Sequence, residues 1–161
     1  MGGRMSFWKA TKENSNVPEL LASQLAHHPD LVLCEDEIAV IFKEKASKKG
    51  GQVVLGAAKK APNLLSVLGD TDWKFILEIA YDEWQGLDLK QQAALLDHLL
   101  CGCGVEEDAI KGTTKYFLKP PDVAFYFGEL ERHGDWRPRP EDAPDGNIVE
   151  LLTGNDPEAS A

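Results

Sequence analysis

One histidine lies in the middle of an apolar segment with a helical period, and its neighbours invite comparison with a zinc-peptidase helix. Residues 91–106 read QQAALLDHLLCGCGVE, in which apolar residues recur every three or four positions around His98. This pattern predicts a helix packed on a core. In the sequence His-Glu-x-x-His, two histidines four residues apart hold zinc and the glutamate acts as base. Here the base position is Leu99 and the second ligand position is Gly102. The spacing therefore leaves His98 as a ligand on its own.

The cysteines are the next candidates for metal chemistry. Cys34, Cys101 and Cys103 are an odd number without C-x-x-C spacing, so we expect free thiols in a reducing compartment. Cys101 lies three residues after His98 and could share its helical face, whereas Cys103 faces elsewhere. Whether a residual metal site uses either thiol stays open. Because catalytic zinc needs three protein ligands and an open water position, we expect no cofactor and a buried, satisfied role for His98.

Other chemistries and locations have less support. The chain lacks the G-x-S-x-G turn of serine hydrolases and the G-x-x-x-x-G-K-[ST] phosphate loop. Its first residues, MGGRMSFWKATKENS, have no apolar core of the signal-peptide type. No apolar run approaches the roughly 20 residues that span a bilayer. We expect a cytoplasmic protein with no membrane contact.

Charge is divided unevenly along the chain. The net charge is −10, with +2 on residues 1–60 and −12 on residues 61–161. This acidity argues against direct binding of nucleic acid, whose phosphates prefer basic surfaces. It permits contact with a basic partner. The acidic residues expected to form such a contact are Glu106, Glu107, Asp108, Glu129, Glu131 and Asp135.

The elements that must position His98 alternate strands with helices. Asp88 is the expected N-cap of the His98 helix. The first two strands are expected to form a hairpin, because a lysine-rich stretch ending in Gly50 and Gly51 joins them. Residues 62–69 are expected to be a short apolar turn or helix, and residues 105–112 an acidic loop. We expect strands at 37–44, 52–60, 73–80 and 115–118, and helices at 17–28, around His98 and at 122–133.

These elements predict an α+β domain. We expect a small, mostly antiparallel sheet of three or four strands packed against three main helices. One domain at residues 16–137 suits the length of the chain. Residues 1–15 are expected to be a flexible N-terminal segment. Residues 138–161 are rich in Pro, Asp, Glu and Gly and are expected to form an acidic disordered tail.

Four segments give the chain a resemblance to a known family. They are VVLGAAKKA at 53–61, FILEIAYDEW at 75–84, QAALLDHLLCGCGVE at 92–106 and PDVAFYFGELERHGDWRP at 121–138. With these segments in this order, the chain resembles the putative phage metallopeptidases, small zincin-like proteins encoded by bacteriophages and prophages. The resemblance covers roughly residues 17–137 and implies a zincin-like fold.

Carried onto this chain, the family's zinc site is incomplete. Family members read like ALLDHELCH at the helix and have a further histidine before Asp-Val. The resemblance thus implies ligands at 98, 102 and 121 and a base at 99. This chain keeps His98 but has Leu99, Gly102 and Pro121, and Ala124 stands where the family has an acid. No replacement offers a side-chain ligand or a proton acceptor. The resemblance therefore implies a metallopeptidase-like pseudoenzyme, not an enzyme.

We expect a non-catalytic phage protein that binds and inhibits or modulates a host protein. The acidic second half favours a partner with a basic or nucleic-acid-binding surface, such as a protein of a defence or DNA-processing system. The acidic residues would bind that surface by mimicking DNA. Two alternatives stay open. One is an active metal-dependent hydrolase with a rearranged zinc site built from His98, a cysteine and an acid such as Asp97 or Asp122. The other is a phage structural or assembly accessory protein.

Overall fold

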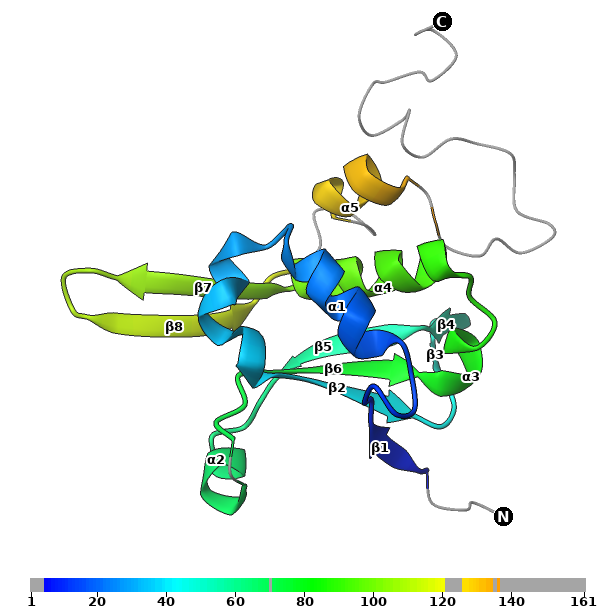
Figure 1. Ribbon diagram of the computed structural model, residues 1–161, viewed down its shortest axis with the longest axis horizontal. Helices are drawn as coiled ribbons and strands as arrows, with labels where there is room; N and C mark the ends of the chain where they lie inside the picture. The colour runs from blue at the N-terminus through cyan, green and yellow to red at the C-terminus, as the bar shows by residue number, and fades with distance from the viewer. Residues whose placement is uncertain (1–4, 70, 121–125, 135, 137–161) are drawn as a thin grey trace, which may run out of the picture.

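A four-stranded sheet forms one layer of the protein, and helices cover one of its faces (Figure 1). The computed structural model describes residues 5–69, 71–120, 126–134 and 136. The strand order is β1 (Phe7–Lys9), β2 (Ile38–Lys43), β6 (Phe75–Ala80) and β5 (Gly56–Lys60). The central pair β2 and β6 is parallel, and both outer pairs are antiparallel. The prediction of an α+β domain with a mostly antiparallel sheet is confirmed.

The predicted main helices lie in two positions relative to the sheet. Two of them, α1 (Val17–Leu25) and α4 (Leu89–Cys101), lie over the sheet, and α5 (Phe127–His133) lies on the side of α4 away from it (Figure 1). A 3₁₀ helix, η1 (Pro29–Glu37), follows α1 and ends the predicted helix at 17–28 early. Pro29 begins this change, because the residue before a proline disfavours the α conformation. Residues 122–125 of the predicted last helix lie outside the described residues.

The core lies between the sheet and the α1–α4 layer. In β6, Phe75, Leu77 and Ile79 are fully buried and alternate with less buried residues, as the sequence predicted. From α4, Leu96 and Leu100 are also fully buried. Truncating such a leucine to alanine in a packed core costs about 2–5 kcal/mol. This packing fixes α4, and therefore its polar residues, relative to the sheet.

The predicted hairpin of strands 37–44 and 52–60 is wrong. β2 and β5 each pair with β6 and not with each other. β2 and β6 carry the larger apolar side chains and occupy the buried centre, whereas β5, with its small residues, takes the edge. The lysine-rich stretch forms a separate ribbon of β3 (Ser47–Lys49) and β4 (Gln52–Val54), turned by Gly50 and Gly51 at φ 59° and 80°.

A second ribbon replaces the predicted acidic loop at 105–112. β7 (Cys103–Asp108) pairs with β8 (Thr113–Leu118), and the ribbon projects from the body (Figure 1). Its outer half is exposed on both faces, so it lacks the apolar alternation by which strands are predicted. A Cβ at Gly104 would lie 2.5 Å from the Phe117 ring, so a larger residue there would have to displace that ring.

Part of the N-terminal segment forms a strand. β1 lies within the expected flexible residues 1–15, yet Trp8 packs on Phe42 and Tyr81, with ring centroids 5.9 and 5.0 Å apart. Burial of this aromatic ring accounts for the strand. The predicted tail at 138–161 lies outside the described residues. In the part of the chain that the structure describes, no helix is both long and apolar enough to cross a membrane.

Candidate functional site

Helix α4 begins with the predicted cap. Asp88 Oδ1 accepts a hydrogen bond of 2.8 Å from the Gln91 backbone, and Gln91 Oε1 accepts one of 3.1 Å from the Asp88 backbone. This capping box satisfies donors at the helix start and fixes the register of α4. Leucines of α4 pack toward the core, which places Asp97 and His98 within reach of α5.

His98 is held by a buried carboxylate from α5. Its Nδ1 hydrogen-bonds Glu129 Oε1, which also accepts a 2.8 Å bond from the Tyr126 backbone, while Glu129 Oε2 accepts one of 2.8 Å from Trp136 Nε1. Burial opposes ionisation of Glu129, but these bonds and the His98 charge outweigh it and hold the pKa below its usual value. The Tyr126 and Trp136 rings flank His98, with centroids 5.1 and 6.4 Å away. His98 is thus a positioned, partly buried imidazole.

The position at which the resemblance implies a base, residue 99, is part of the core. Leu99 is 3% exposed and faces the edge strand β5. A Cβ at Gly56 would lie 3.2 Å from Leu99 Cδ1 and 2.9 Å from the Glu78 carbonyl oxygen. The leucine therefore packs directly on backbone that only glycine allows to come so close. No proton-accepting group remains at this position.

The position at which the resemblance implies a second zinc ligand, residue 102, is closed by another side chain. At Gly102 a Cβ would lie 2.9 Å from the Tyr126 hydroxyl and 3.7 Å from Ala58 Cβ. That hydroxyl donates a 2.8 Å hydrogen bond to the Lys119 carbonyl oxygen, so it is held over Gly102. The third inferred position, Pro121, lies outside the described residues. The residues at 98, 99 and 102 do not fit a catalytic zinc, because one imidazole cannot hold it.

A second buried carboxylate lies beside His98 on α4. Asp97 is fully buried, and Arg132 of α5 donates to both of its oxygens, from Nε at 2.8 Å and from Nη2 at 2.9 Å. His28 Nε2 lies 2.6 Å from Asp97 Oδ1, and His133 Nε2 lies 3.2 Å from Oδ2. Burial raises the pKa of Asp97, but the bonds from His28 and Arg132 outweigh it and bring the pKa to about 2. Asp97 thus joins α4 to α5 and to the segment after α1.

Three ligating atoms of this cluster are close enough to suggest a metal. The His28 nitrogen, an Asp97 oxygen and Cys101 Sγ all lie within 4.8 Å of one another. However, Arg132 Nη2 already lies 2.9 Å from Asp97 Oδ1 and 3.6 Å from Cys101 Sγ. Burial raises the pKa of the Cys101 thiol to about 12, which opposes the thiolate that a metal requires. The guanidinium therefore supplies the positive charge that a metal would bring.

The predicted acidic contact residues form two groups in the structure, one on β7 and one in or near α5. Glu106, Glu107 and Asp108 are exposed on β7, although Asp108 Oδ1 also accepts hydrogen bonds from the backbones of Ile110 and Lys111 in the turn. Side chains alternate along a strand, so Glu107 faces away from the other two.

The second acidic group is corrected in part. Glu131 is exposed, but Glu129 is fully buried and cannot contact a partner, because three donors draw its carboxylate inward. Asp135 lies outside the described residues.

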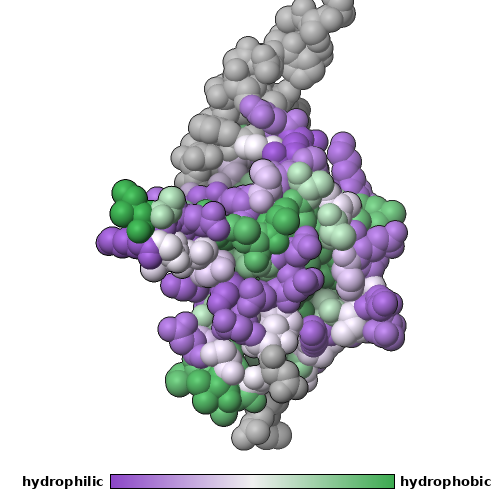
Figure 2. Space-filling model, turned by 60° about the vertical axis from the view of Figure 1, so that its left-hand side comes forward, coloured by the Kyte–Doolittle hydropathy of each residue, from purple (hydrophilic) through white to green (hydrophobic). Residues whose placement is uncertain are grey.

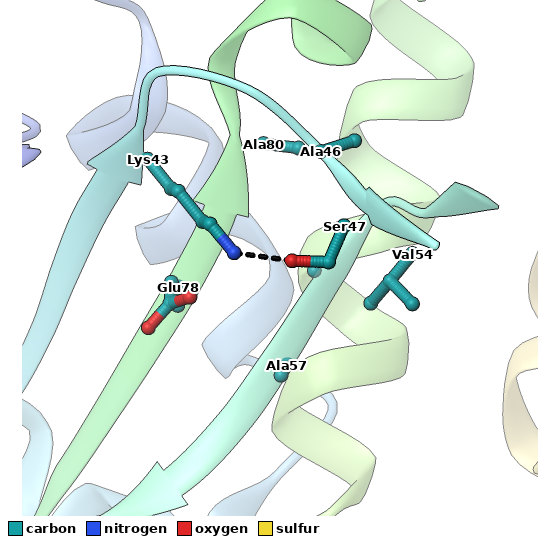
Figure 3. Close-up of a pocket in the computed structure, with 8 residues that line it drawn as sticks. Lys43, Ala46, Ser47, Val54, Ala57, Glu78 and Ala80 are labelled. Carbon is teal, nitrogen blue, oxygen red and sulfur yellow. Dashed lines mark hydrogen bonds between the residues drawn. The ribbon is translucent and has the colours of Figure 1, made fainter. Parts of the chain in front are cut away.

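A small surface hollow lies away from His98. It has a volume of about 40 Å³, and Lys43 Nζ donates to Ser47 Oγ at its rim (Figure 3). Its lining residues Lys43 and Glu78 alternate along their strands with the core residues Phe42 and Leu77. The hollow therefore opens on the face of the sheet opposite α4. Its size suits one or two waters.

Sequence reasoning missed the two carboxylate clusters. The ending Arg132-His133-Gly134-x-Trp136 served only as a family marker, yet it supplies three of the groups that surround Asp97 and Glu129. A usable signal was Asp97 within an apolar helical face, because a carboxylate there must find a cationic partner. Nothing local identified His28 as that partner, since it lies 69 residues away.

Comparison with known proteins gives one match. A family model described as "Putative phage metallopeptidase" matches residues 6–144, which is most of the chain. No curated protein and no solved structure matches.

Proposed function

Since the chain belongs to the putative phage metallopeptidase family, we propose that it is a non-catalytic member, which uses the fold to bind a host protein in the host cytoplasm. The observation that carries this proposal is Leu99. It takes the place of the catalytic base and is buried against Gly56. A site converted to core in this way contributes to stability and not to proton transfer.

Peptide hydrolysis by a metallopeptidase needs an activated water. Zinc lowers the pKa of that water, and a nearby carboxylate takes its proton. Both buried carboxylates near His98 are already engaged, Glu129 by His98 and Trp136, and Asp97 by Arg132. Neither is available as a base without breaking those bonds. The pairing supports a structural role for both.

An assay for hydrolysis tests the absence of catalysis. Fluorescently labelled casein would be incubated with the zinc-supplemented protein and with its His98→Ala variant. We expect both to match the rate of buffer alone. A rate above buffer that is lost in His98→Ala would refute the proposal.

The partner that fits the charge of the chain is a host protein with a basic, nucleic-acid-binding surface. The net charge is −10, and the projecting β7–β8 ribbon presents Glu106, Glu107 and Asp108 to solvent. Acidic groups on such an arm would accelerate association with a basic groove and imitate DNA phosphates there. Inhibition or modulation of a defence or DNA-processing system would follow from occupying that groove.

Charge reversal tests this binding mode. The double variant Glu106→Lys, Glu107→Lys should lose capture of the host partner and the dependence of that capture on salt. The double variant Glu13→Lys, Glu19→Lys is the matched control, since both residues are exposed acids outside the ribbon. Equal capture by wild type and both variants would remove the acidic ribbon from the proposal.

One observation favours a second candidate, a hydrolase with a rearranged zinc site. It is the approach of His28, Asp97 and Cys101 to within 4.8 Å. A zinc ion there would have to displace Arg132 from Asp97. Zinc bound by wild type and lost in Cys101→Ser, but kept in His98→Ala, would select this candidate.

A further inference from the structure

The 3₁₀ helix η1 exposes an apolar pair on an acidic element. Val32 and Leu33 are 54 and 56% exposed, and η1 carries four acids and no Lys or Arg. Glu35 and Asp36 are exposed and form no ion pair with a described residue. η1 follows α1 and contacts the base of the β7–β8 ribbon (Figure 1). Figure 2 shows this side of the molecule with apolar areas between hydrophilic groups, the lowest of them at α2 (Leu64–Leu68).

The complementary chemistry lies on the β3–β4 ribbon. Residues 45–54 carry three lysines and no acid. Lys48 and Val53 are cross-strand partners, so their side chains share one face of the ribbon. Both are exposed, Val53 by 43%. Neither Lys48 nor Lys49 forms an ion pair with a described residue. This ribbon therefore offers lysines beside an apolar group, where η1 offers acids beside apolar groups.

The two surfaces lie toward opposite ends of the molecule (Figure 1), so one chain cannot bring its own pair together. Two different surfaces that meet between identical copies form a heterologous contact, which repeats from copy to copy. We propose that the β3–β4 ribbon of one copy docks on η1 of a second copy. In this contact Val53 packs on Leu33 and the lysines of the ribbon lie against the acids of η1. The contact involves neither the host partner nor His98.

The net charge of −10 opposes association only at long range. The screening length at physiological ionic strength is about 8 Å, so repulsion between distant parts of two copies is weak, whereas charges in contact still attract. Other occupants of η1 fit less well. Two η1 surfaces face to face would bring only acids together, and the acids also oppose nucleic acid and an anionic membrane. The contact is small, so we expect a weak, reversible association.

Sedimentation velocity of the purified, untagged full chain tests the proposal. The chain would be measured in physiological salt at concentrations from about 10 μM to 1 mM, the range suited to a small interface. We expect the weight-average mass to rise with concentration from the 17.7 kDa of one chain. Because a heterologous contact leaves a free surface at each end of the assembly, the mass should continue past the dimer.

A charge exchange between two variants identifies the surfaces. Lys48→Glu with Lys49→Glu takes the net charge from −10 to −14, and Glu35→Lys with Asp36→Lys takes it to −6. Each variant alone should associate about tenfold or more weakly than wild type, because like charges then face each other. An equimolar mixture should associate again, since each reversed surface meets its complement. Both net charges are negative, so overall attraction between the two variants cannot produce this rescue.

The matched control is Glu13→Lys with Glu19→Lys, which has the same net charge of −6 and changes exposed acids outside both surfaces. It should associate like wild type. Leu33→Gln should weaken association without a change of charge, and all variants should keep the wild-type melting temperature, because the changed residues are exposed. A monomer at every concentration, growth that stops at a dimer, insensitivity to both charge reversals, or a mixture that stays monomeric would overturn the proposal.

Discussion

Replacement of Asp97 by asparagine should destabilise the protein more than any change at an exposed acid. The carboxylate is fully buried and accepts two hydrogen bonds from Arg132 and one from His28. Asp97→Asn keeps the shape but removes the charge and one acceptor. Losing one partner of a buried pair costs about 3–5 kcal/mol. Because the Arg132 side chain is 26% exposed and partly solvated, we expect about 3 kcal/mol, or a melting temperature lower by about 6–12 °C.

The same carboxylate should make the wild-type protein sensitive to acid. The pKa of Asp97 falls from 3.8 to about 2 on folding. Because the folded-state pKa lies below the unfolded-state pKa, this contribution is complete above about pH 4 and is lost as pH falls toward 2. The shift corresponds to about 2 kcal/mol of unfolding free energy. Asp97→Asn lacks this titration.

Urea denaturation followed by tryptophan fluorescence, at pH 7 and at pH 3, measures both effects. The matched control is Glu107→Gln, an exposed acid on β7 that should change the free energy of unfolding by less than about 0.5 kcal/mol. The difference between wild type and Asp97→Asn should shrink at pH 3. A loss below about 1 kcal/mol at pH 7, or an equal loss at both pH values, would refute the reasoning.

Further changes probe the other parts of the site. Leu99→Glu should lower the free energy of unfolding by about 3 kcal/mol or more, because it buries a charge against Gly56. The variant should also show no casein hydrolysis. A free energy of unfolding equal to that of wild type would show that the base position is still open. Gly56→Ala should cost about 1–3 kcal/mol in urea unfolding, because its Cβ would lie 2.9 Å from the Glu78 carbonyl oxygen; a neutral effect would contradict this packing. Burial raises the pKa of Cys34 to about 11 and those of Cys101 and Cys103 to about 12, so all three thiols should react slowly with iodoacetamide at pH 7.5 until urea unfolds the chain. Fast modification of the folded protein would argue against their burial.

The His98 helix could be predicted because its signals are local. Asp88 was predicted as the N-cap, and in the structure it forms a capping box with Gln91. The period of the leucines identified the buried face of the helix. The sequence reading extended this helix too far. The helix ends at Cys101 and a strand starts at Cys103, because the residues from Cys103 onward pair with β8. No local pattern in the sequence indicates that pairing.

Strand partners and buried carboxylates were harder to predict because they depend on distant contacts. The pairing of β2 with β6 joins Ile38 to Phe75 and is parallel, so no turn between them indicates it. Glu129 looked like one acid among several in a charged helix. Its burial follows from donors at His98, Tyr126 and Trp136 that converge only in the folded chain.

The claim that this metallopeptidase relative has no catalytic zinc is tested most directly by elemental analysis of the untagged protein. Wild type, His98→Ala and Cys101→Ser would be purified side by side without added metal. We predict far less than one zinc per chain in all three, because only His98 remains of the inferred site at 98, 99 and 102 and Arg132 already occupies the Asp97 cluster. About one zinc per chain in wild type, lost in His98→Ala, would contradict the claim.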